Sequence, residues 1–362
     1  MLKSVCGAFH ILGDFLTAER YGSGHINDTY KVTCNLAGKT VHYLLQRINQ
    51  SVFPRPDQVQ ENIVRVTEHL AHKLPPEVRT CRTLTLVPAK DGAAYHRNEA
   101  GYWRVYLFVE GASSHDVSET PDQTYQAAKA FAEFQCNLAD LPAPRLHETI
   151  PGFHDTEKRY RTFLEVLEKD PCNRAAGCKP EIAFLEARAG HCARFNRLLA
   201  EGKLPERITH NDTKINNVLL NDATGEGQCV IDLDTVMPGL ALNDFGDMCR
   251  TGTAAAAEDE QDLSKVACRL DLFEAMAKGY CSKAQAFLNE TEKAELPFAP
   301  RLITQTIAIR FLTDHLAGDT YFKIHRPNHN LDRFRTQMQM ILDMEQKAGQ
   351  MEKIVQQALS EG

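Results

Sequence analysis

Short apolar runs typical of β-strands occupy the first third of the chain. They lie at residues 30–32, 41–45 and 103–109, where Tyr, Val, Leu and Phe are common. Runs of this kind between turn residues predict strands. Between the second and third runs, apolar residues recur at helical spacing from about Asp57 to Leu70. We therefore expect a sheet-rich first lobe that contains one helix.

Helical periodicity dominates the chain beyond Gly111. Thr120 followed by Pro121 is typical of a capped helix start. Further helices are predicted at about 155–168, 180–201, 261–279, 300–316 and 330–359, with one β insertion at about 207–234. Residues 110–114 are the expected hinge. The pattern predicts an α+β fold with an N-terminal lobe, residues 1–110, and a helical C-terminal lobe, residues 111–362.

The β insertion predicts an antiparallel hairpin. Residues 218–220 and 229–231 are apolar, and a turn-rich segment separates them. Asn217 begins the first strand and Asp232 ends the second, so the hairpin brings an amide oxygen and a carboxylate together. Asp212 lies on the loop just before. Hard oxygen ligands beside a free carboxylate suit a Mg²⁺–nucleotide site.

Each of these Asn and Asp residues, taken singly, is more often a turn-forming residue. Their joint pattern is much rarer: His210, Asp212 and Asn217 at fixed spacing, followed by an apolar strand that ends in Asp232. This pattern favours an ATP-dependent kinase in which Asp212 orients the attacking hydroxyl.

Composition narrows the choice of partner. The chain is 43% hydrophobic and 25% charged, which is typical of globular proteins, and its net charge of −7 gives no basic face for nucleic acid or an anionic membrane. No apolar stretch reaches about 18 residues. Eleven scattered cysteines include no Cys-x-x-Cys. We expect a soluble, cytoplasmic protein with a small-molecule substrate and no indicated protein partner.

Residues 210–217 and the Ile-Asp strand end at 231–232 resemble the aminoglycoside phosphotransferase and choline kinase superfamily. Residues 21–30, 45–49 and 310–314 are similar to segments of the N-acetylhexosamine 1-kinases within it. The resemblance spans residues 20–325. It implies a bilobal protein-kinase-like fold, the cofactors ATP and Mg²⁺, and phosphorylation of the anomeric hydroxyl of GlcNAc or GalNAc. The alternatives are a superfamily kinase for a cationic acceptor, or a non-catalytic nucleotide-binding pseudokinase.

The resemblance also implies roles for residues of the catalytic segment. Asp212 is the expected base, Asn217 and Asp232 the expected Mg²⁺ ligands. His210 and Asp247 are expected to hold the loop in place.

Asp234 departs from the superfamily pattern. Strand alternation predicts that it faces the same side as Asp232. We therefore expect it to touch a second metal ion or the sugar.

A nucleotide site is expected in the first lobe. Gly22, Ser23 and Gly24 stand where kinases place a glycine-rich lid, although a hairpin turn explains them equally well. The usual strand lysine is missing, and Arg47 is its expected substitute. Further nucleotide-site residues are expected at Glu61, as the helix partner of Arg47, and at Glu110. A plain surface ion pair between Arg47 and Glu61 is the alternative.

Arg310 and Tyr321 match residues that reach the sugar in the N-acetylhexosamine kinases. Their side chains can hydrogen-bond an acetamido group, and neither suits a polycation. His25 is expected as a third contact. The alternative for Arg310 is an ion pair with Asp314, four residues on. Gluco and galacto acceptors both stay open.

Overall fold

The structure is a computed structural model that describes residues 1–22 and 26–361. Its internal contacts divide the chain into two compact units. Unit 1 comprises Met1–Ser113, Asp140–Pro151 and Leu219–Pro238. Unit 2 comprises Ser114–Ala139, Gly152–Val218 and Gly239–Gly362.

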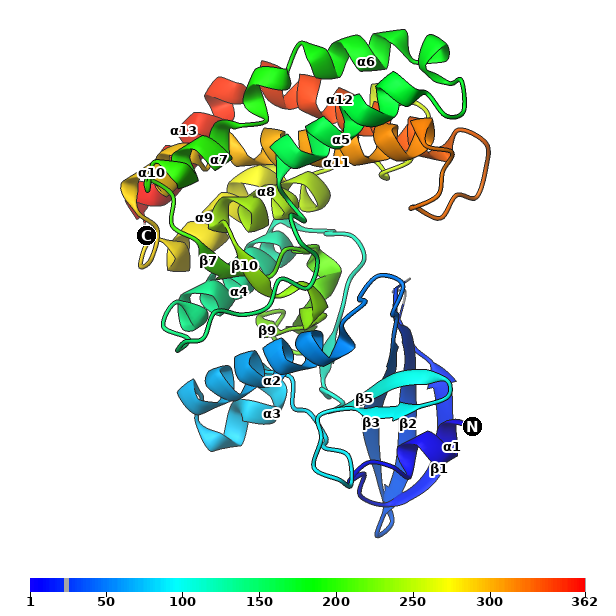
Figure 1. The fold of residues 1–362 in the computed structure, drawn as a ribbon. Helices are drawn as coiled ribbons and strands as arrows, with labels where there is room; N and C mark the ends of the chain where they lie inside the picture. The colour runs from blue at the N-terminus through cyan, green and yellow to red at the C-terminus, as the bar shows by residue number, and fades with distance from the viewer. Residues whose placement is uncertain (23–25, 362) are drawn as a thin grey trace. The chain divides into compact units, whose positions relative to one another are not determined.

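Unit 1 is built on a five-stranded antiparallel sheet of order β1-β2-β3-β5-β4 (Figure 1). Apolar side chains on its covered face, such as Leu45, Trp103 and Val105, are fully buried. The predicted runs 30–32 and 41–45 fall in β2 and β3, and the run 103–109 falls in β5 as far as Leu107, so the three strands are confirmed. The strands are β1 (Asp14–Arg20), β2 (Asp28–Leu36), β3 (Lys39–Ile48), β4 (His96–Asn98) and β5 (Gly101–Leu107).

A long helix and a small second sheet complete unit 1. Helix α2 begins at Pro56 and buries Val59, Ile63 and Val66, as the periodicity predicts. In the second sheet β8 lies between β6 and β9, which confirms the predicted hairpin. The elements are α1 (Leu2–Cys6), α2 (Pro56–Lys73), η1 (Pro76–Val78), α3 (Arg79–Arg82), β6 (Ala112–Ser113), β8 (Val218–Asn221), β9 (Gly227–Val230), η5 (Leu233–Thr235) and β10 (Met237–Gly239).

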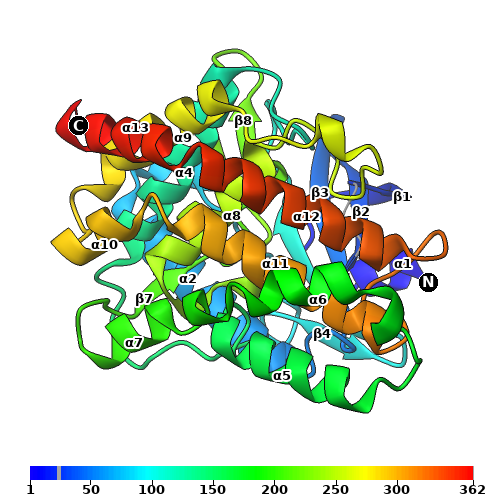
Figure 2. The ribbon, with the colours of Figure 1, turned by 90° about the horizontal axis from the view of Figure 1, so that it is seen from above.

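Unit 2 is mainly helical. Helix α4 packs on α9, while α11 packs on α5, α8 and α12 (Figure 2). The Thr120 hydroxyl accepts the Gln123 N–H at 3.3 Å, so the predicted cap of α4 is confirmed. The elements are α4 (Pro121–Leu138), α5 (Thr156–Lys169), η2 (Ala175–Gly177), α6 (Lys179–Glu186), η3 (Ala189–His191), α7 (Arg194–Ala200), β7 (Arg207–Thr209), η4 (Ile215–Asn217), α8 (Ala241–Gly252), η6 (Leu263–Lys265), α9 (Leu270–Ala284), α10 (Glu290–Glu295), α11 (Ala299–Leu316), α12 (His329–Gln346) and α13 (Ala348–Glu361).

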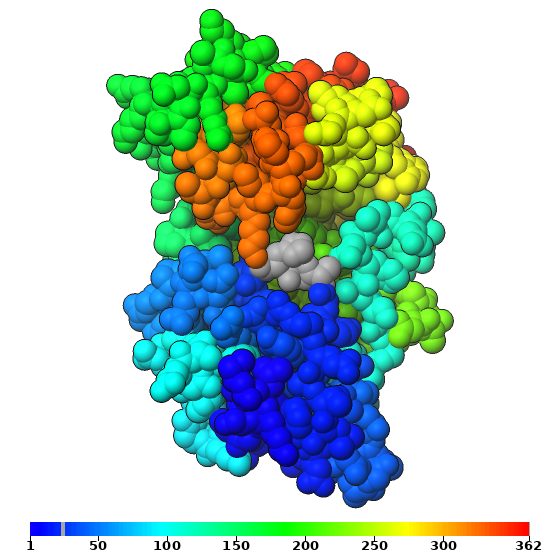
Figure 3. All heavy atoms as spheres, turned by 90° about the vertical axis from the view of Figure 1, so that its right-hand side faces the viewer, coloured from blue at the N-terminus to red at the C-terminus, as the bar shows by residue number. Residues whose placement is uncertain are grey.

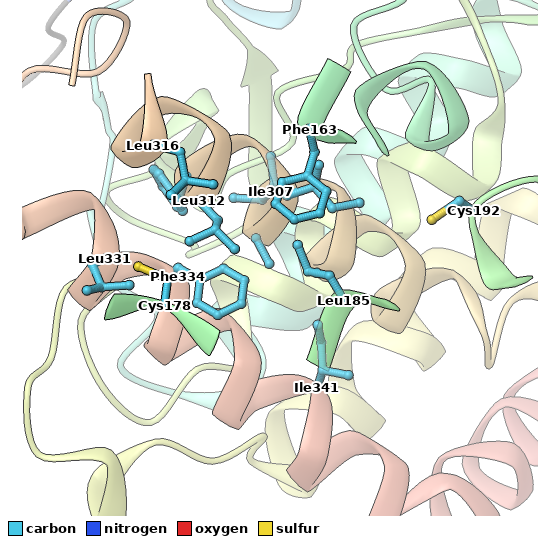
Figure 4. Packing of buried hydrophobic residues seen from close by; sticks show 13 residues of the cluster. Phe163, Cys178, Leu185, Cys192, Ile307, Leu312, Leu316, Leu331, Phe334 and Ile341 are labelled. Carbon is cyan, nitrogen blue, oxygen red and sulfur yellow. The ribbon is translucent and has the colours of Figure 1, made fainter. Parts of the chain in front are cut away.

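One face of unit 2 is formed by α5 and α6 beside the segment that joins α11 to α12 (Figure 3, green and orange). A hydrophobic cluster lies beneath this face (Figure 4). Phe163, Leu185, Leu312 and Phe334, one from each of these four helices, are fully buried in it. The face therefore rests on a close-packed base.

The α+β class with an antiparallel N-terminal sheet is confirmed, but three predicted helices were wrong in extent. The segment 180–201 is broken into α6, η3 and α7, and 330–359 is two helices that part at Lys347. In the segment 261–279 the α-helix begins only at Leu270. Periodicity reports which face is apolar and not where a helix breaks. In the described part of the chain, no helix is long and apolar enough to cross a membrane.

Helices α4 and α9 approach closely at Gly279. A Cβ placed there would lie 2.2 Å from the Tyr125 carbonyl oxygen, so the helix backbones would have to separate. We predict that Gly279→Ala lowers the free energy of unfolding by about 1–3 kcal/mol, as overpacking does. Urea denaturation measures this change.

Gly349 in α13 provides the matched control, because a Cβ there meets no atom within 4 Å. Gly349→Ala should stabilise the protein by up to about 1 kcal/mol through helix propensity. Equal effects of the two substitutions would contradict the close approach.

Candidate active site

The loop after β7 is held by a buried carboxylate. The backbone N–H groups of His210 and Asn211 donate to the two oxygens of Asp244 at 2.8 and 2.7 Å. Asn211 has a φ of 65°, a left-handed conformation that a non-glycine residue adopts only when its surroundings hold it. These bonds from α8 therefore fix the turn immediately before Asp212.

The Asp244 carboxylate is itself fixed by side chains from two other helices. Gln135 of α4 donates to it at 2.6 Å, and Tyr280 of α9 donates to Gln135 at 2.7 Å. Burial raises the pKa of Asp244 to about 7, while its three N–H donors oppose the rise. The position of the loop thus depends on the packing of α4, α8 and α9.

Asp247 accepts fewer backbone hydrogen bonds from the loop than we predicted. It accepts one backbone bond, from Thr213 N–H at 3.2 Å, and pairs with Arg250 at 2.9 Å. The backbone bonds expected of Asp247 are mainly made by Asp244, one helical turn earlier. Both positions lie on the same face of α8, and sequence spacing does not tell which of them takes more of the loop N–H groups.

The predicted loop residue His210 is fully buried. Its ring packs edge-on against Phe131 and Phe134 of α4, with centroids 5.3 and 6.0 Å apart. Its Nδ1 accepts the Asp212 N–H at 3.3 Å. This geometry ties the loop to α4.

Asp212 lies beside a cation and an amide. The Lys214 ammonium is 3.0 Å from its carboxylate. The amide nitrogen of Asn217 donates to the Asp212 carbonyl at 2.7 Å and to its carboxylate at 3.1 Å. The amide nitrogen faces Asp212, so the Asn217 amide oxygen, which makes no hydrogen bond within the described residues, is free to accept a bond.

Two opposing effects set the charge of Asp212. Burial favours the neutral acid, but Lys214 and His210 together hold the pKa of the carboxyl below its ordinary value. The carboxylate is 25% exposed, so it is accessible as well as ionised. It can therefore accept a proton at neutral pH.

In unit 1, the strand alternation from which we predicted the orientation of Asp234 does not extend to this residue. Strand β9 ends at Val230, Asp232 has a φ of 59°, and residues 233–235 form a 3₁₀ turn. The alternation argument fails because the backbone has left the strand conformation.

Asp234 is half of a buried ion pair. Both of its oxygens accept from the Arg104 guanidinium of β5 at 2.6 Å, and the two side chains are 2% and 1% exposed. Asn27 donates to the same carboxylate at 2.9 Å. Both of its oxygens are thus engaged within unit 1, and the expected contact of Asp234 with a second metal ion or the sugar stays a prediction.

Arg104 also bridges the sheet and α2. Its Nε donates to Gln46 of β3 at 2.9 Å, and its Nη1 donates to Gln60 of α2 at 3.1 Å. Arg104 is directly opposite Gln46 in the ladder. The buried cation of this unit is thus on β5.

The predicted pair of Arg47 with Glu61 was wrong. Arg47 pairs with Asp28 on the neighbouring strand, which is its directly opposite residue, and Glu61 pairs with His147 at 2.9 Å. Cross-strand neighbours are closer than a residue on a helix. Glu110 pairs with His42 at 2.6 Å.

The predicted glycine-rich segment is described only in part. Gly22 has a φ of 79°, a conformation that favours glycine, and Asn27 donates its amide to Asp234. Ser23, Gly24 and His25 lie outside the described residues.

Arg310 and Tyr321 are brought together in unit 2. The guanidinium Nη2 and the phenol oxygen are 3.4 Å apart, and both residues line a cavity of about 250 Å³. Arg310 does not pair with Asp314. That carboxylate instead accepts the backbone N–H groups of Thr320, Tyr321 and Phe322 at 2.8–2.9 Å.

Residues 17–277 match the model of the phosphotransferase enzyme family, APH. That match covers most of the chain. The chain belongs to the phosphotransferase enzyme family. Like the other members of this superfamily, it is a small-molecule phosphotransferase.

Solved structures agree on the fold of this phosphotransferase. It is similar to an aminoglycoside phosphotransferase from Alicyclobacillus acidocaldarius, with 13% identity over 99% of this chain and 96% of that chain and a TM-score of 0.59. It is also similar to a spectinomycin phosphotransferase in complex with ADP and spectinomycin. The identity is 13% over 93% of this chain and 94% of that chain, and the TM-score is 0.55. A choline kinase from Cryptosporidium parvum Iowa II shares 13% identity over 99% of this chain and 95% of that chain, with a TM-score of 0.51. At this identity the similarity shows a shared fold.

The matched residues cover only part of the predicted site. The loop at 210–217, Asp232 and Asp247 lie inside the family match, whereas Arg310 and Tyr321 lie beyond residue 277. The roles of all these residues in the phosphotransferase stay predictions.

Sequence reasoning missed several residues that hold the site of the phosphotransferase. Lys214 was visible in the motif, two residues after Asp212, as a cation close enough to pair with it. Arg104 gave no such signal, because its partners are distant in sequence. His154 Nε2 is 2.8 Å from the Asn211 carbonyl oxygen, to which it can donate.

The buried pair of Arg104 and Asp234 gives a test of stability. Removing one partner leaves a buried charge uncompensated, so Arg104→Met and Asp234→Leu should each cost about 3–5 kcal/mol. The double variant should cost much less than the sum of the two. Urea denaturation of all four proteins measures the coupling.

Arg55→Met is the control, because Arg55 forms an exposed pair with Asp57. This substitution should leave the denaturation midpoint unchanged. Additive losses in the double variant would show that Arg104 and Asp234 are not coupled.

Proposed function

We propose that this phosphotransferase transfers the γ-phosphoryl group of ATP to the anomeric hydroxyl of an N-acetylhexosamine, GlcNAc or GalNAc. The observation that carries the proposal is the ionised Asp212 carboxylate, held beside Lys214 and Asn217 on a fixed loop. A non-catalytic nucleotide-binding protein would have no use for an accessible base held in this way.

In the proposed reaction Asp212 accepts the proton of the sugar hydroxyl. The sugar oxygen forms a bond to the γ-phosphorus, the bond to the β-phosphate oxygen breaks, and ADP leaves. Asp212 also orients the hydroxyl, because its own backbone and side chain are tied to His210 and Asn217. Lys214 lies where its ammonium can meet negative charge on the transferred group.

Asn217 and Asp232 are the proposed Mg²⁺ ligands. The amide oxygen of Asn217 is directed away from the bonds that its nitrogen makes to Asp212, and carboxylate and amide oxygens are ligands that Mg²⁺ accepts. When bound, the ion would neutralise charge on the phosphates. Asp234 holds the turn that carries Asp232.

The proposed nucleotide contacts lie in unit 1. Gly22, with its left-handed backbone, and Glu110, next to the first sheet, are retained from the predicted set. Arg47 is retained with Asp28 as its partner in place of Glu61. The spectinomycin phosphotransferase structure that contains ADP supports nucleotide binding in this fold.

The cavity beside Arg310 favours a sugar over a cationic acceptor. It is lined by two arginines, Arg159 and Arg310, and by the Tyr321 and Phe322 rings. Its acidic residue, Asp314, is engaged by four N–H donors. Aromatic rings and guanidinium groups suit a neutral sugar with an acetamido carbonyl.

The decisive experiment is product analysis with a catalytic variant. Wild-type protein with ATP and Mg²⁺ should release ADP with an N-acetylhexosamine, and ³¹P NMR should place the phosphate on the anomeric oxygen. Asp212→Asn should lower kcat by about 10²–10⁴-fold, the usual contribution of a general base, with unchanged nucleotide affinity.

Asp222→Asn, in the exposed turn of the β8–β9 hairpin, is the matched control and should keep full activity. The same assay should include an aminoglycoside, choline and methylthioribose. Near-normal activity of Asp212→Asn would refute the assigned base. Phosphate on a non-anomeric oxygen, or turnover only with a cation, would refute the assigned acceptor.

Lys214 gives a pH test. Asp212 must be ionised to accept a proton, and Lys214 helps to hold its pKa low. In Lys214→Met the pKa of Asp212 should rise, so the acid limb of the kcat profile should move to higher pH. A lower kcat with an unmoved acid limb would show that Lys214 acts only on the phosphate.

A further inference from the structure

The cavity beside Arg310 contains a second guanidinium group that a neutral sugar does not require. The cavity of about 250 Å³ is formed by α5, by the end of α11 and by the segment that follows α11. Arg159 of α5 lines the cavity and forms no ion pair with a described residue. Arg310 of α11 also forms no ion pair with a described residue.

Arg310 is held among aromatic rings. Its guanidinium carbon is 5.1 Å from the ring centroid of Phe153, 5.6 Å from that of Tyr321 and 5.3 Å from that of Phe322. Ring faces attract a cation but do not neutralise it. The guanidinium of Arg310 is therefore held in place by aromatic rings, without an ion pair to a described carboxylate.

Arg159 is held by hydrogen bonds to the backbone of Phe153. Its Nε and Nη2 donate to the Phe153 carbonyl oxygen at 3.4 and 3.2 Å. Burial lowers the pKa of Arg159, and the positive charge of Arg310 lowers it further. The two guanidinium groups thus repel each other across an environment that is partly apolar.

The carboxylate of Asp314 does not relieve this repulsion. It accepts three consecutive backbone N–H groups at residues 320–322 and the side-chain amide of Asn330 at 2.9 Å. Neither Arg159 nor Arg310 reaches it. Its role is to shape the segment that carries Tyr321.

We propose that this cavity binds an oxyanion, a carboxylate or a sulfate ester, through Arg159 and Arg310. An oxyanion would accept charge-assisted hydrogen bonds from both groups and remove their mutual repulsion. The further statement that the acceptor itself carries this anion, as an acidic N-acetylhexosamine, rests on the proposed function. The oxyanion site itself does not.

The position of the cavity links such a ligand to the catalytic loop. The Phe153 ring lies against the Arg310 guanidinium, and the next residue, His154, meets the Asn211 carbonyl at 2.8 Å through its Nε2. Asn211 immediately precedes Asp212. One short segment therefore contacts both the oxyanion site and the loop that carries the base.

The test compares acidic and neutral acceptors. Values of kcat/KM are measured for N-acetylglucosamine, its 6-sulfate and its C6 carboxylate at constant ionic strength. Wild-type protein should favour the acidic sugars by roughly 10- to 100-fold, the range expected for one charge-assisted hydrogen bond. Arg159→Met should remove this preference, and Arg159→Lys, which keeps the charge, should retain part of it.

Arg161→Met is the matched control. Arg161 is two residues away on α5, 63% exposed and paired with Glu157, so its loss should leave the preference unchanged. Melting temperatures without ligand verify that each variant is folded. Equal kcat/KM for acidic and neutral sugars, with no stabilisation of wild type by sodium sulfate over potassium chloride, would overturn the proposal.

Binding of sulfate alone separates the two sources of the anion. Stabilisation of wild type but not of Arg159→Met by sodium sulfate, without preference for acidic sugars, would support an oxyanion site for a free anion. If no sugar is phosphorylated, the same Arg159-dependent stabilisation would still support the site, while the proposed function would fall. Loss of stabilisation in Arg161→Met as well would count against the site.

Discussion

The loop at residues 210–217 depends on one buried carboxylate. Asp244 receives two successive backbone N–H groups from His210 and Asn211, and these bonds hold Asn211 in a left-handed conformation. A strained residue of this kind persists only where its surroundings over-determine it. Here the constraint comes from three helices, because Gln135 of α4 and Tyr280 of α9 complete the network around Asp244 of α8.

Unit 1 contains a comparable buried hydrogen-bond network, but its central group is a cation. The fully buried Arg104 holds Asp234 with two parallel bonds, and it also bonds Gln46 of the sheet and Gln60 of α2. A buried ion pair adds little to stability by comparison with an apolar pair of the same shape, but it defines one arrangement of the groups around it. The turn that follows β9, with Asp232 in it, is thereby fixed to β5 and α2.

Charge also distinguishes two regions of unit 2, the loop at residues 210–217 and the cavity beside Arg310. On the loop, Lys214 compensates Asp212 and keeps it ionised. In the cavity, neither Arg159 nor Arg310 forms an ion pair with a described residue, and the carboxylate that lines the cavity, Asp314, is engaged by backbone N–H groups. An ion-paired carboxylate on the loop and guanidinium groups without ion pairs at the cavity agree with the roles proposed for the two regions.

The sequence pattern alone was enough to predict the class of fold and a small-molecule phosphotransferase. Alternation and helical spacing report which residues face a core, so the strands β2, β3 and β5, the hairpin and most helices were predicted correctly. The motif from His210 to Asn217 is contiguous, and its local spacing survives folding. Partners distant in the chain were decided only by the tertiary structure. Asp244 makes most of the backbone bonds that we expected of Asp247, and Arg104 pairs with Asp234, because the geometry of packed helices and paired strands sets which side chains meet, and no local pattern encodes it.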